Sequence, residues 1–193
     1  VLIIPWVALG GADQLNINIL QLLTALGTWT FTVVCMFDID GEASISSSLN
    51  FVLPKVQQYT EDILVLPHFV AECDRARFLL YLLKSRNADV ALFSNAYAGY
   101  LALPYLQPRL PDVAFVDLVH MREEWKPEVA RLGIGGNSAL AGGMSRLSVE
   151  ASPFFDSTIY ISEDERRWAS KQVAYYEAAQ AEANTEADHK SKY

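Results

Sequence analysis

The stretch VLIIPWVALGGADQLNINIL, residues 1–20, sets the pattern of this protein because a strand runs through two glycines into a helix. Residues 1–7 are rich in Val, Ile and Leu, which is typical of a strand buried on both faces. Asp13 falls in the first turn of the next segment, where an acidic side chain suits the helix dipole. The pair Gly10–Gly11 has two interpretations: a tight turn, or bare backbone that a ligand approaches.

The helix after the glycines carries apolar residues at helical spacing and ends at Gly27, a natural stop. Its apolar positions are Leu15, Ile19, Leu22, Leu23 and Leu26. The stretch TFTVVCMF, residues 30–37, is dense in β-branched and aromatic side chains and predicts a second strand. This strand–helix–strand order is the unit from which parallel sheets are built.

The same alternation continues to the end of the chain. Further strands are predicted over residues 62–67, 89–93, 112–120 and 157–162, and helices over 51–59, 72–86, 97–106, 147–155 and from 163 toward 183. Six strands alternating with helices predict an α/β fold, a doubly wound, mainly parallel six-stranded Rossmann-like sheet with helices on both faces. Residues 1–183 form this domain, and the polar residues 184–193 are expected to fray.

Composition excludes several classes of protein. The net charge of −8 and the absence of a Lys and Arg cluster argue against nucleic-acid binding. Cys35 and Cys73 lie outside any metal-ligand spacing, which favours two reduced thiols in a cytoplasmic protein and no metal site. Residues 14–37 lack charge, but Asn16, Asn18 and Gly27 favour a helix followed by a strand over a membrane span.

Ligands of doubly wound sheets bind at the carboxyl ends of the strands. Four such exits carry residues suited to binding: Gly10–Gly11, His68, Ser94–Asn95 and His120. His120 closes the fifth strand, where it can bond a sugar hydroxyl or a phosphate or respond to pH, and a structural role is equally open. The bare backbone of the glycine pair would let an anion reach helix N–H groups.

Aspartates precede four of the predicted strands, at the opposite edge of the sheet. They are Asp62, Asp89, Asp112 and Asp156, and we interpret them as structural. The chain has neither the Gly-x-Gly-x-x-Gly fingerprint of dinucleotide-binding proteins nor a Walker A loop. The glycine-rich residues 133–143 do not directly follow a strand and are interpreted as a flexible loop.

Five segments, in order, carry a resemblance to a known family. They are IPWVALGGADQLNINIL at 4–20, VLPHF at 65–69, SNAYAGYLALPYL at 94–106, PDVAFVDLVHMREEW at 111–125 and RLSVEASPFFDSTIYISEDERRW at 146–168. In these the chain, from residue 1 to about 171, resembles the N-terminal domain of GT-B-fold glycosyltransferases, specifically of glycosyltransferase family four.

The resemblance implies the acceptor-side half of a retaining, hexosyltransferase-type enzyme that uses a nucleotide-sugar donor and no metal or other cofactor. It implies that Gly10 and Gly11 face the diphosphate of the donor and that the catalytic residue His120 contacts the transferred sugar. Ser94, Asn95, His68, Met121 and Glu123 are then expected to line the cleft or bind the acceptor, a glycan, a lipid-linked sugar or a small molecule. For Glu123 a solvated loop is the alternative.

The resemblance departs from the family's pattern in two places. The donor-binding domain with its paired glutamates is not in these 193 residues, so the chain alone is expected to be inactive. Residues 126–144 form a longer, more glycine-rich connection than the family has.

The alternative interpretation is a non-catalytic α/β module that docks a partner or a glycan. A nucleotide-dependent oxidoreductase or epimerase is disfavoured by the missing fingerprint. The expected partners are the donor-binding domain and a sugar acceptor, and the location is cytoplasmic, with contact at the cytosolic face of a membrane left open.

Overall fold

A computed structural model describes residues 1–7, 10–37, 52–120, 150–171, 173–174 and 178. Its centre is a six-stranded sheet in which every neighbouring pair is parallel, in the order β3-β2-β1-β4-β5-β6. The strands are β1 (Leu2–Ile4), β2 (Val33–Cys35), β3 (Ile63–Val65), β4 (Val90–Ser94), β5 (Ala114–Val119) and β6 (Ser157–Tyr160). All six predicted strands are present: β4 is shifted by one residue and the others are shorter than predicted. The Rossmann-like doubly wound fold is confirmed.

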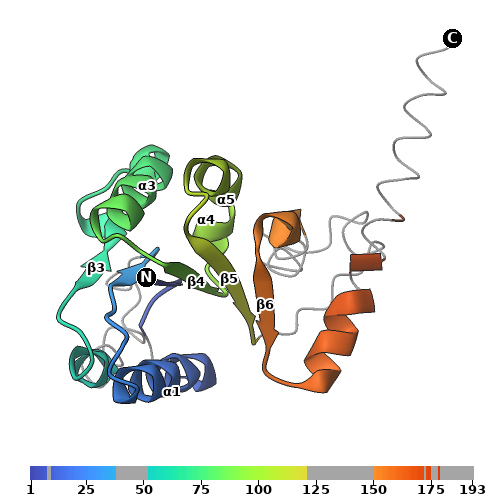
Figure 1. The fold of residues 1–193 in the computed structure, drawn as a ribbon, viewed down its shortest axis with the longest axis horizontal. Coiled ribbons are helices and arrows are strands. Elements are labelled where there is room, and N and C mark those ends of the chain that lie inside the picture. Colours follow the sequence, from blue (N-terminus) through green and yellow to red (C-terminus); the bar gives the residue numbers. More distant parts are fainter. Residues whose placement is uncertain (8–9, 38–51, 121–149, 172, 175–177, 179–193) are drawn as a thin grey trace, which may run out of the picture.

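Helices cover both faces of the sheet (Figure 1). They are α1 (Gly11–Ala25), a turn of helix at 52–57, η1 (Leu66–His68), η2 (Glu72–Asp74), α3 (Arg75–Ser85), α4 (Tyr97–Tyr100), α5 (Leu103–Leu106), η3 (Gln107–Arg109), η4 (Ser152–Phe154) and a helix at 163–171. In Figure 1, α3, α4 and α5 lie on one side of the sheet, while α1 and the helix at 163–171 lie on the other. The predicted helix at 97–106 is broken in two, and the break precedes Pro104, which sits in the first turn of α5.

The hydrophobic core has two layers, one on each face of the sheet. The larger lies under α3, α4 and α5 and includes the fully buried Phe93, Phe115 and Leu79. The smaller lies under α1 and the turn at 52–57 and includes Leu20 and Val56. Buried strands with side chains on both faces explain why β1 and β2 are continuous apolar runs instead of alternating ones.

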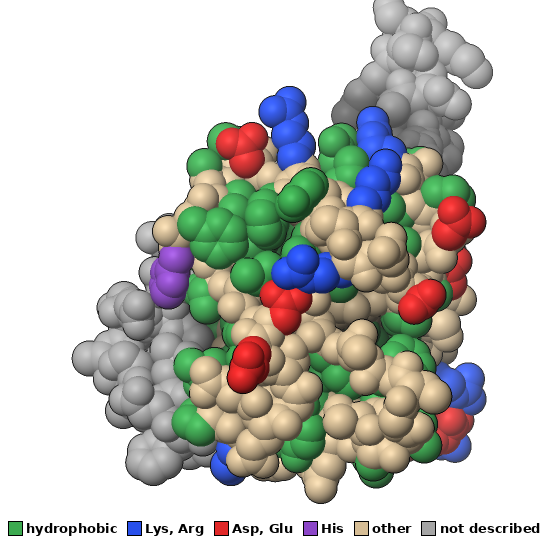
Figure 2. Space-filling view, turned by 60° about the vertical axis from the view of Figure 1, so that its left-hand side comes forward, with side chains coloured by type: hydrophobic (Ala, Val, Ile, Leu, Met, Phe, Trp, Pro, Cys, Tyr) green, Lys and Arg blue, Asp and Glu red, His purple; other side chains and the backbone are tan. Residues whose placement is uncertain are grey.

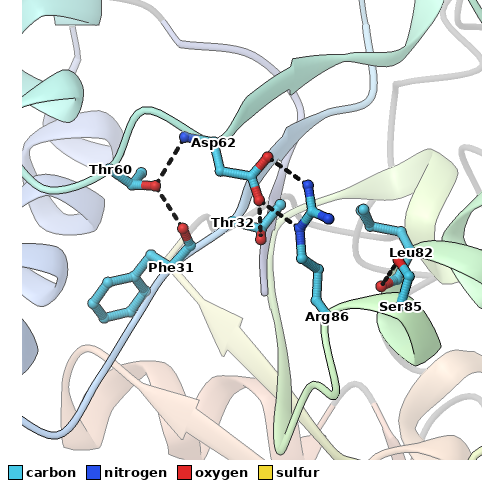
Figure 3. Close-up of polar contacts among 7 residues, drawn as sticks. All are labelled: Phe31, Thr32, Thr60, Asp62, Leu82, Ser85 and Arg86. Carbon is cyan, nitrogen blue, oxygen red and sulfur yellow. Dashed lines mark hydrogen bonds and ion pairs between the residues drawn. The ribbon is translucent and has the colours of Figure 1, made fainter.

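Two of the four aspartates at the amino edge, Asp62 and Asp156, have the structural role predicted for them. Figure 3 shows Asp62 receiving two hydrogen bonds from the guanidinium of Arg86, at 2.7 and 2.9 Å, and one from the hydroxyl of Thr32 at 2.6 Å. The bonds from Arg86 hold the pKa of the Asp62 carboxyl below its usual value. Asp156 accepts a hydrogen bond from the backbone N–H of Phe115 at 2.7 Å, which joins β5 to the start of β6. These carboxylates fix the strand entrances and leave the other edge of the sheet for ligands.

Helix α1 buries a different face from the one that its leucines suggest. Its buried side chains are Asn16, Ile17 and Leu20, whereas Leu22 and Leu26 are 67% and 66% exposed. The remaining leucine-rich face borders a hollow of about 790 Å³ between α1 and the β4–β6 part of the sheet. The apolar residues of α1 have helical spacing on both faces, so spacing alone does not tell which face is buried. The position of the sheet decides it.

Candidate functional site

The strand order reverses between β1 and β4, so this is the switch point at which open α/β sheets form a ligand crevice. The chain leaves β1 toward Gly10 and Gly11, leaves β4 at Ser94 and leaves β5 at His120. Because parallel strands end at the same edge, these three exits are neighbours at the carboxyl edge. The sequence predicted all of these residues as site residues, and the topology brings their exits together.

Ser94, Asn95 and His120 form one hydrogen-bonded cluster. The hydroxyl oxygen of Ser94 lies 2.8 Å from Nε2 of His120, and the amide nitrogen of Asn95 lies 3.1 Å from Nδ1. Asn95 has a left-handed backbone, φ 46°, which turns the chain off the end of β4 and presents its amide to the imidazole. Both ring nitrogens are therefore held by residues at the end of the adjacent strand.

Which ring nitrogen of His120 carries the proton depends on the orientation of the Asn95 amide. With the amide nitrogen toward Nδ1, as here, Nδ1 of the neutral ring accepts and the Nε2–H donates to the Ser94 hydroxyl. Burial lowers the pKa of His120, which also favours the neutral ring at pH 7. A histidine that donates to a serine cannot take the proton of that serine, and Ser94 is fully buried. The geometry thus disfavours Ser94 as a nucleophile and makes it an anchor for His120.

The cluster faces the side of the sheet that α1 covers. Leu92, two residues before Ser94, packs against the core layer under α1, and Leu118, two residues before His120, lines the hollow beside α1. Side chains two apart in a strand share a face. Since α1 follows β1, its N-terminus lies at the same edge, so Gly10–Gly11 and His120 share a face and an edge.

The glycine pair is not required by backbone conformation. Gly10 is extended, with φ −160°, and neither it nor Gly11 has the positive φ that favours glycine. Among the described residues, a Cβ on Gly11 would meet nothing within 4 Å, and a Cβ on Gly10 would lie 3.3 Å from a carboxylate oxygen of Asp13. In this part of the chain, neither a positive φ nor a close neighbour therefore requires glycine at position 11. The N–H groups of this first helical turn form the positive end of the helix dipole.

Two residues near this edge were missed in the sequence. Asn16 lies on the sheet-facing side of α1 and is buried, and its Oδ1 has no hydrogen-bond partner within the described part of the chain. Trp6 follows β1 and is 40% exposed. The signals were a lone amide within an apolar stripe and an indole directly after a buried strand, and both depend on knowing which face is covered.

His68 is not part of the hydrogen-bonded cluster, and its place in the cleft stays a prediction. It ends η1 after β3, the edge strand, and β3 lies four strand spacings from β5, about 19 Å. Figure 2 shows hydrophobic side chains gathered on the surface over the α3 side of the molecule. The exposed rings there include Phe69 and Tyr81, which pack against Phe78 with centroids 5.4 and 6.3 Å apart. Met121 and Glu123 lie outside the described residues.

Two further searches of the structure gave no site. In the described ranges, no group of three or more His, Cys, Asp or Glu side chains is placed to hold a metal ion. Over the same ranges, no helix has both the length and the apolar character needed to cross a membrane. Cys35 is buried, which raises the pKa of its thiol to about 12, and Cys73 is exposed and forms no disulfide.

Comparisons with known proteins identify no relative of this chain. No protein-family model matches it, and neither does any curated protein or any solved structure.

Proposed function

We propose that this chain is the acceptor-side domain of a retaining glycosyltransferase, which moves a sugar from a nucleotide-sugar donor to an acceptor. The observation that carries the proposal is the Ser94–His120–Asn95 cluster at the switch point, on the same face and edge as an uncrowded helix start. The nucleotide would be held by a second domain across the cleft.

The start of α1 suits the leaving group of such a transfer. A departing nucleoside diphosphate gains negative charge, and the free N–H groups and dipole of a helix N-terminus stabilise it. Gly11 leaves the backbone there without a side chain. The Asp13 carboxylate lies in the same first turn and repels an anion, so the backbone N–H groups must outweigh that repulsion. We propose that a diphosphate meets this edge at Gly10–Gly11 through backbone N–H groups and without a metal.

His120 suits the sugar side of the reaction. A neutral imidazole at the strand end can donate or accept a hydrogen bond without adding charge beside an oxocarbenium-like centre. Both ring nitrogens are already bonded, so a sugar hydroxyl reaches the ring by replacing either the Asn95 amide or the Ser94 hydroxyl. Asn95 is the partner that we expect to give way, because Ser94 is fully buried.

The test is the release of nucleoside diphosphate by the full natural polypeptide, with a panel of UDP- and GDP-sugars and simple glycoside acceptors. His120→Ala is expected to lower kcat by about 10²-fold or more, as for loss of a preorganised hydrogen-bonding group. It leaves the buried Ser94 hydroxyl unpaired, so the free energy of unfolding falls by only about 1–3 kcal/mol. The matched control is His189→Ala, which removes the same side chain from the polar tail.

Two results would contradict the proposal. One is equal turnover for His120→Ala and the parent protein. The other is the absence of transfer and of donor hydrolysis with every donor, combined with binding of an unmodified glycan, which would favour the non-catalytic module. The two functions are separated because only the enzyme releases nucleoside diphosphate.

A further inference from the structure

Trp6 is a large apolar side chain that is partly exposed at the carboxyl edge of the sheet, where the ligand is proposed to bind. It follows β1, the central strand beside the switch point, and 40% of it is exposed. Aromatic side chains normally bury 150–250 Å², so an exposed indole at a binding edge calls for a reason. The proposed sugar transfer gives Trp6 no role so far.

The ring of Trp6 is held in place without being hidden. Phe37, just after β2, lies with its ring centroid 6.1 Å from that of Trp6, and the two planes make an angle of 58°. The backbone N–H of Phe37 donates to the carbonyl of Pro5, so the exits of β1 and β2 are tied together. A tilted pair of this kind holds the indole by an aromatic contact that is not a parallel stack.

A second tryptophan provides an internal comparison. Trp29, which precedes β2, is 39% exposed and lies nearly parallel to Phe31, with an interplanar angle of 13° and centroids 6.4 Å apart. It lies at the amino edge of the sheet, away from His120. The two residues are therefore matched in exposure and in having a phenylalanine neighbour, and differ in the edge that they occupy.

The strand order gives the separation of the two backbone exits that a ligand at both residues would have to bridge. β1 and β5 are separated by β4, so their exits lie two strand spacings apart, about 10 Å. Two linked pyranose rings cover such a span, with one ring at His120 and the next at Trp6. The C–H face of a pyranose is apolar and flat, which complements an indole, while the hydroxyls at its rim remain free for polar partners or water.

We propose that Trp6 is a stacking platform for a pyranose ring of the acceptor, one sugar away from the ring at which His120 acts. This subsite rests on the proposed sugar transfer and names the acceptor as a glycan of at least two rings. Trp6 binds and positions the acceptor and takes no part in the bond exchange.

The binding test uses the full chain labelled with 5-fluorotryptophan and followed by fluorine NMR. The probes are the methyl glycosides of glucose, mannose, galactose and N-acetylglucosamine, together with cellobiose and mannobiose. The Trp6 resonance is assigned from Trp6→Phe and is expected to shift with dissociation constants on the order of 1–10 mM. The Trp29 resonance is the control and should not move. Shifts of both resonances, or of neither over that range of concentration, would overturn the subsite.

The kinetic test uses Trp6→Ala, Trp6→Phe and Trp29→Ala in the full natural polypeptide. Trp6→Ala should raise KM for a disaccharide acceptor about tenfold with little change in kcat, and Trp6→Phe should restore most of the loss. Trp29→Ala should behave as the parent protein. Thermal unfolding of each variant separates loss of binding from loss of fold, and an unchanged KM in folded Trp6→Ala contradicts the subsite.

The outcomes distinguish the subsite from the proposed function. If His120→Ala abolishes transfer while Trp6→Ala leaves KM unchanged, the subsite is wrong and the enzyme stands. If sugars shift the Trp6 resonance alone but no donor is turned over, the subsite stands and the transfer is wrong.

Discussion

Two asparagines hold left-handed backbone conformations at opposite ends of β4. Asn87, with φ 45°, precedes the strand, and Asn95, with φ 46°, follows it. Asparagine tolerates this conformation better than most residues. Only Asn95 has its amide on an imidazole, where the donated bond stabilises the neutral form of His120. Comparing Asn87 with Asn95 therefore distinguishes the effect of the left-handed backbone from the effect of the side-chain amide.

We predict that the His120 ring titrates below its ordinary value of 6.5, and that Asn95→Gly raises its pKa. Glycine keeps the backbone conformation but removes the donor that favours the neutral ring, and it exposes the ring to water. Because the unfolded chain takes up the proton first, the free energy of unfolding falls as the pH drops below 6.5 toward the folded pKa. Asn95→Gly should narrow the pH range over which this loss of stability occurs. NMR titration of the ring and urea unfolding at several pH values measure both effects.

The control for this prediction is Asn87→Gly, which makes the same change at the other end of β4. It should leave the pKa of His120 where it is in the parent protein. An equal rise in both variants, or a fall in Asn95→Gly, would contradict the assigned role of the amide.

At the scale of elements, α4 approaches the sheet far more closely than the start of α1 does. A Cβ on Gly99 would lie 2.9 Å from two carbons of the Phe93 ring and 3.3 Å from Ile3 Cγ2. Phe93 is fully buried and packs against Phe115, Tyr100 and Phe155. A side chain at Gly99 therefore forces the aromatic core or α4 to shift, whereas no atom of the described residues lies within 4 Å of a Cβ on Gly11. One glycine is required by packing and the other is not.

We predict that Gly99→Ala lowers the free energy of unfolding by about 1–3 kcal/mol, because it overpacks a rigid aromatic core. Gly11→Ala should leave it unchanged or raise it by up to about 1 kcal/mol, because alanine is the better helix former. Urea denaturation of the two variants makes the comparison. Equal stability of the two would show that α4 can shift away from Phe93. In the proposed enzyme, the stable Gly11→Ala variant should still lose turnover.

At the scale of the whole molecule, the two faces of the sheet are covered unequally. The face under α3, α4 and α5 is closed by a continuous core, while the other face has the hollow between α1 and β4–β6. Leu22 of α1 and Ile161 beyond β6 line this hollow, and they are 67% and 52% exposed. Apolar surface of this kind is accessible to a hydrophobic dye in the native state.

We predict that the native protein enhances the fluorescence of the anionic dye anilinonaphthalene sulfonate and that the double variant Leu22→Glu, Ile161→Glu reduces this enhancement several-fold. The two carboxylates repel the sulfonate and make the hollow less apolar without removing a core side chain, so the unfolding temperature should hardly change. Tyr81→Glu alters a side chain that is 65% exposed on α3, outside the hollow, and serves as the control. If it lowers the dye signal equally, the dye binds elsewhere.

Much of the fold was predictable because local chemistry and global fold agree. Gly27 ends α1 with a positive φ of 71°, as expected of a C-terminal stop. The Ser162 hydroxyl accepts the backbone N–H of Glu165 at 3.1 Å, as the predicted capping motif requires, and Glu163 pairs with Arg167 at 3.2 Å. These interactions span at most four residues, so sequence spacing contains all of the information that they need.

For the candidate site, the sequence predicts some features and only the tertiary structure shows others, for a physical reason. Strand exits, and with them Gly10, Ser94 and His120, followed from the sequence alone, because strand–helix alternation determines which edge each exit occupies. The lateral order of the strands did not follow from the sequence. Only the tertiary structure places β3 at the far edge, which separates His68 from the cluster. It also places β4 beside β5, which joins Ser94 and Asn95 to both nitrogens of His120. The same holds for the buried Asn16 and the uncovered Trp6. Periodicity reports the spacing of side chains along one element, whereas lateral order and coverage depend on long-range packing between elements that no local pattern encodes.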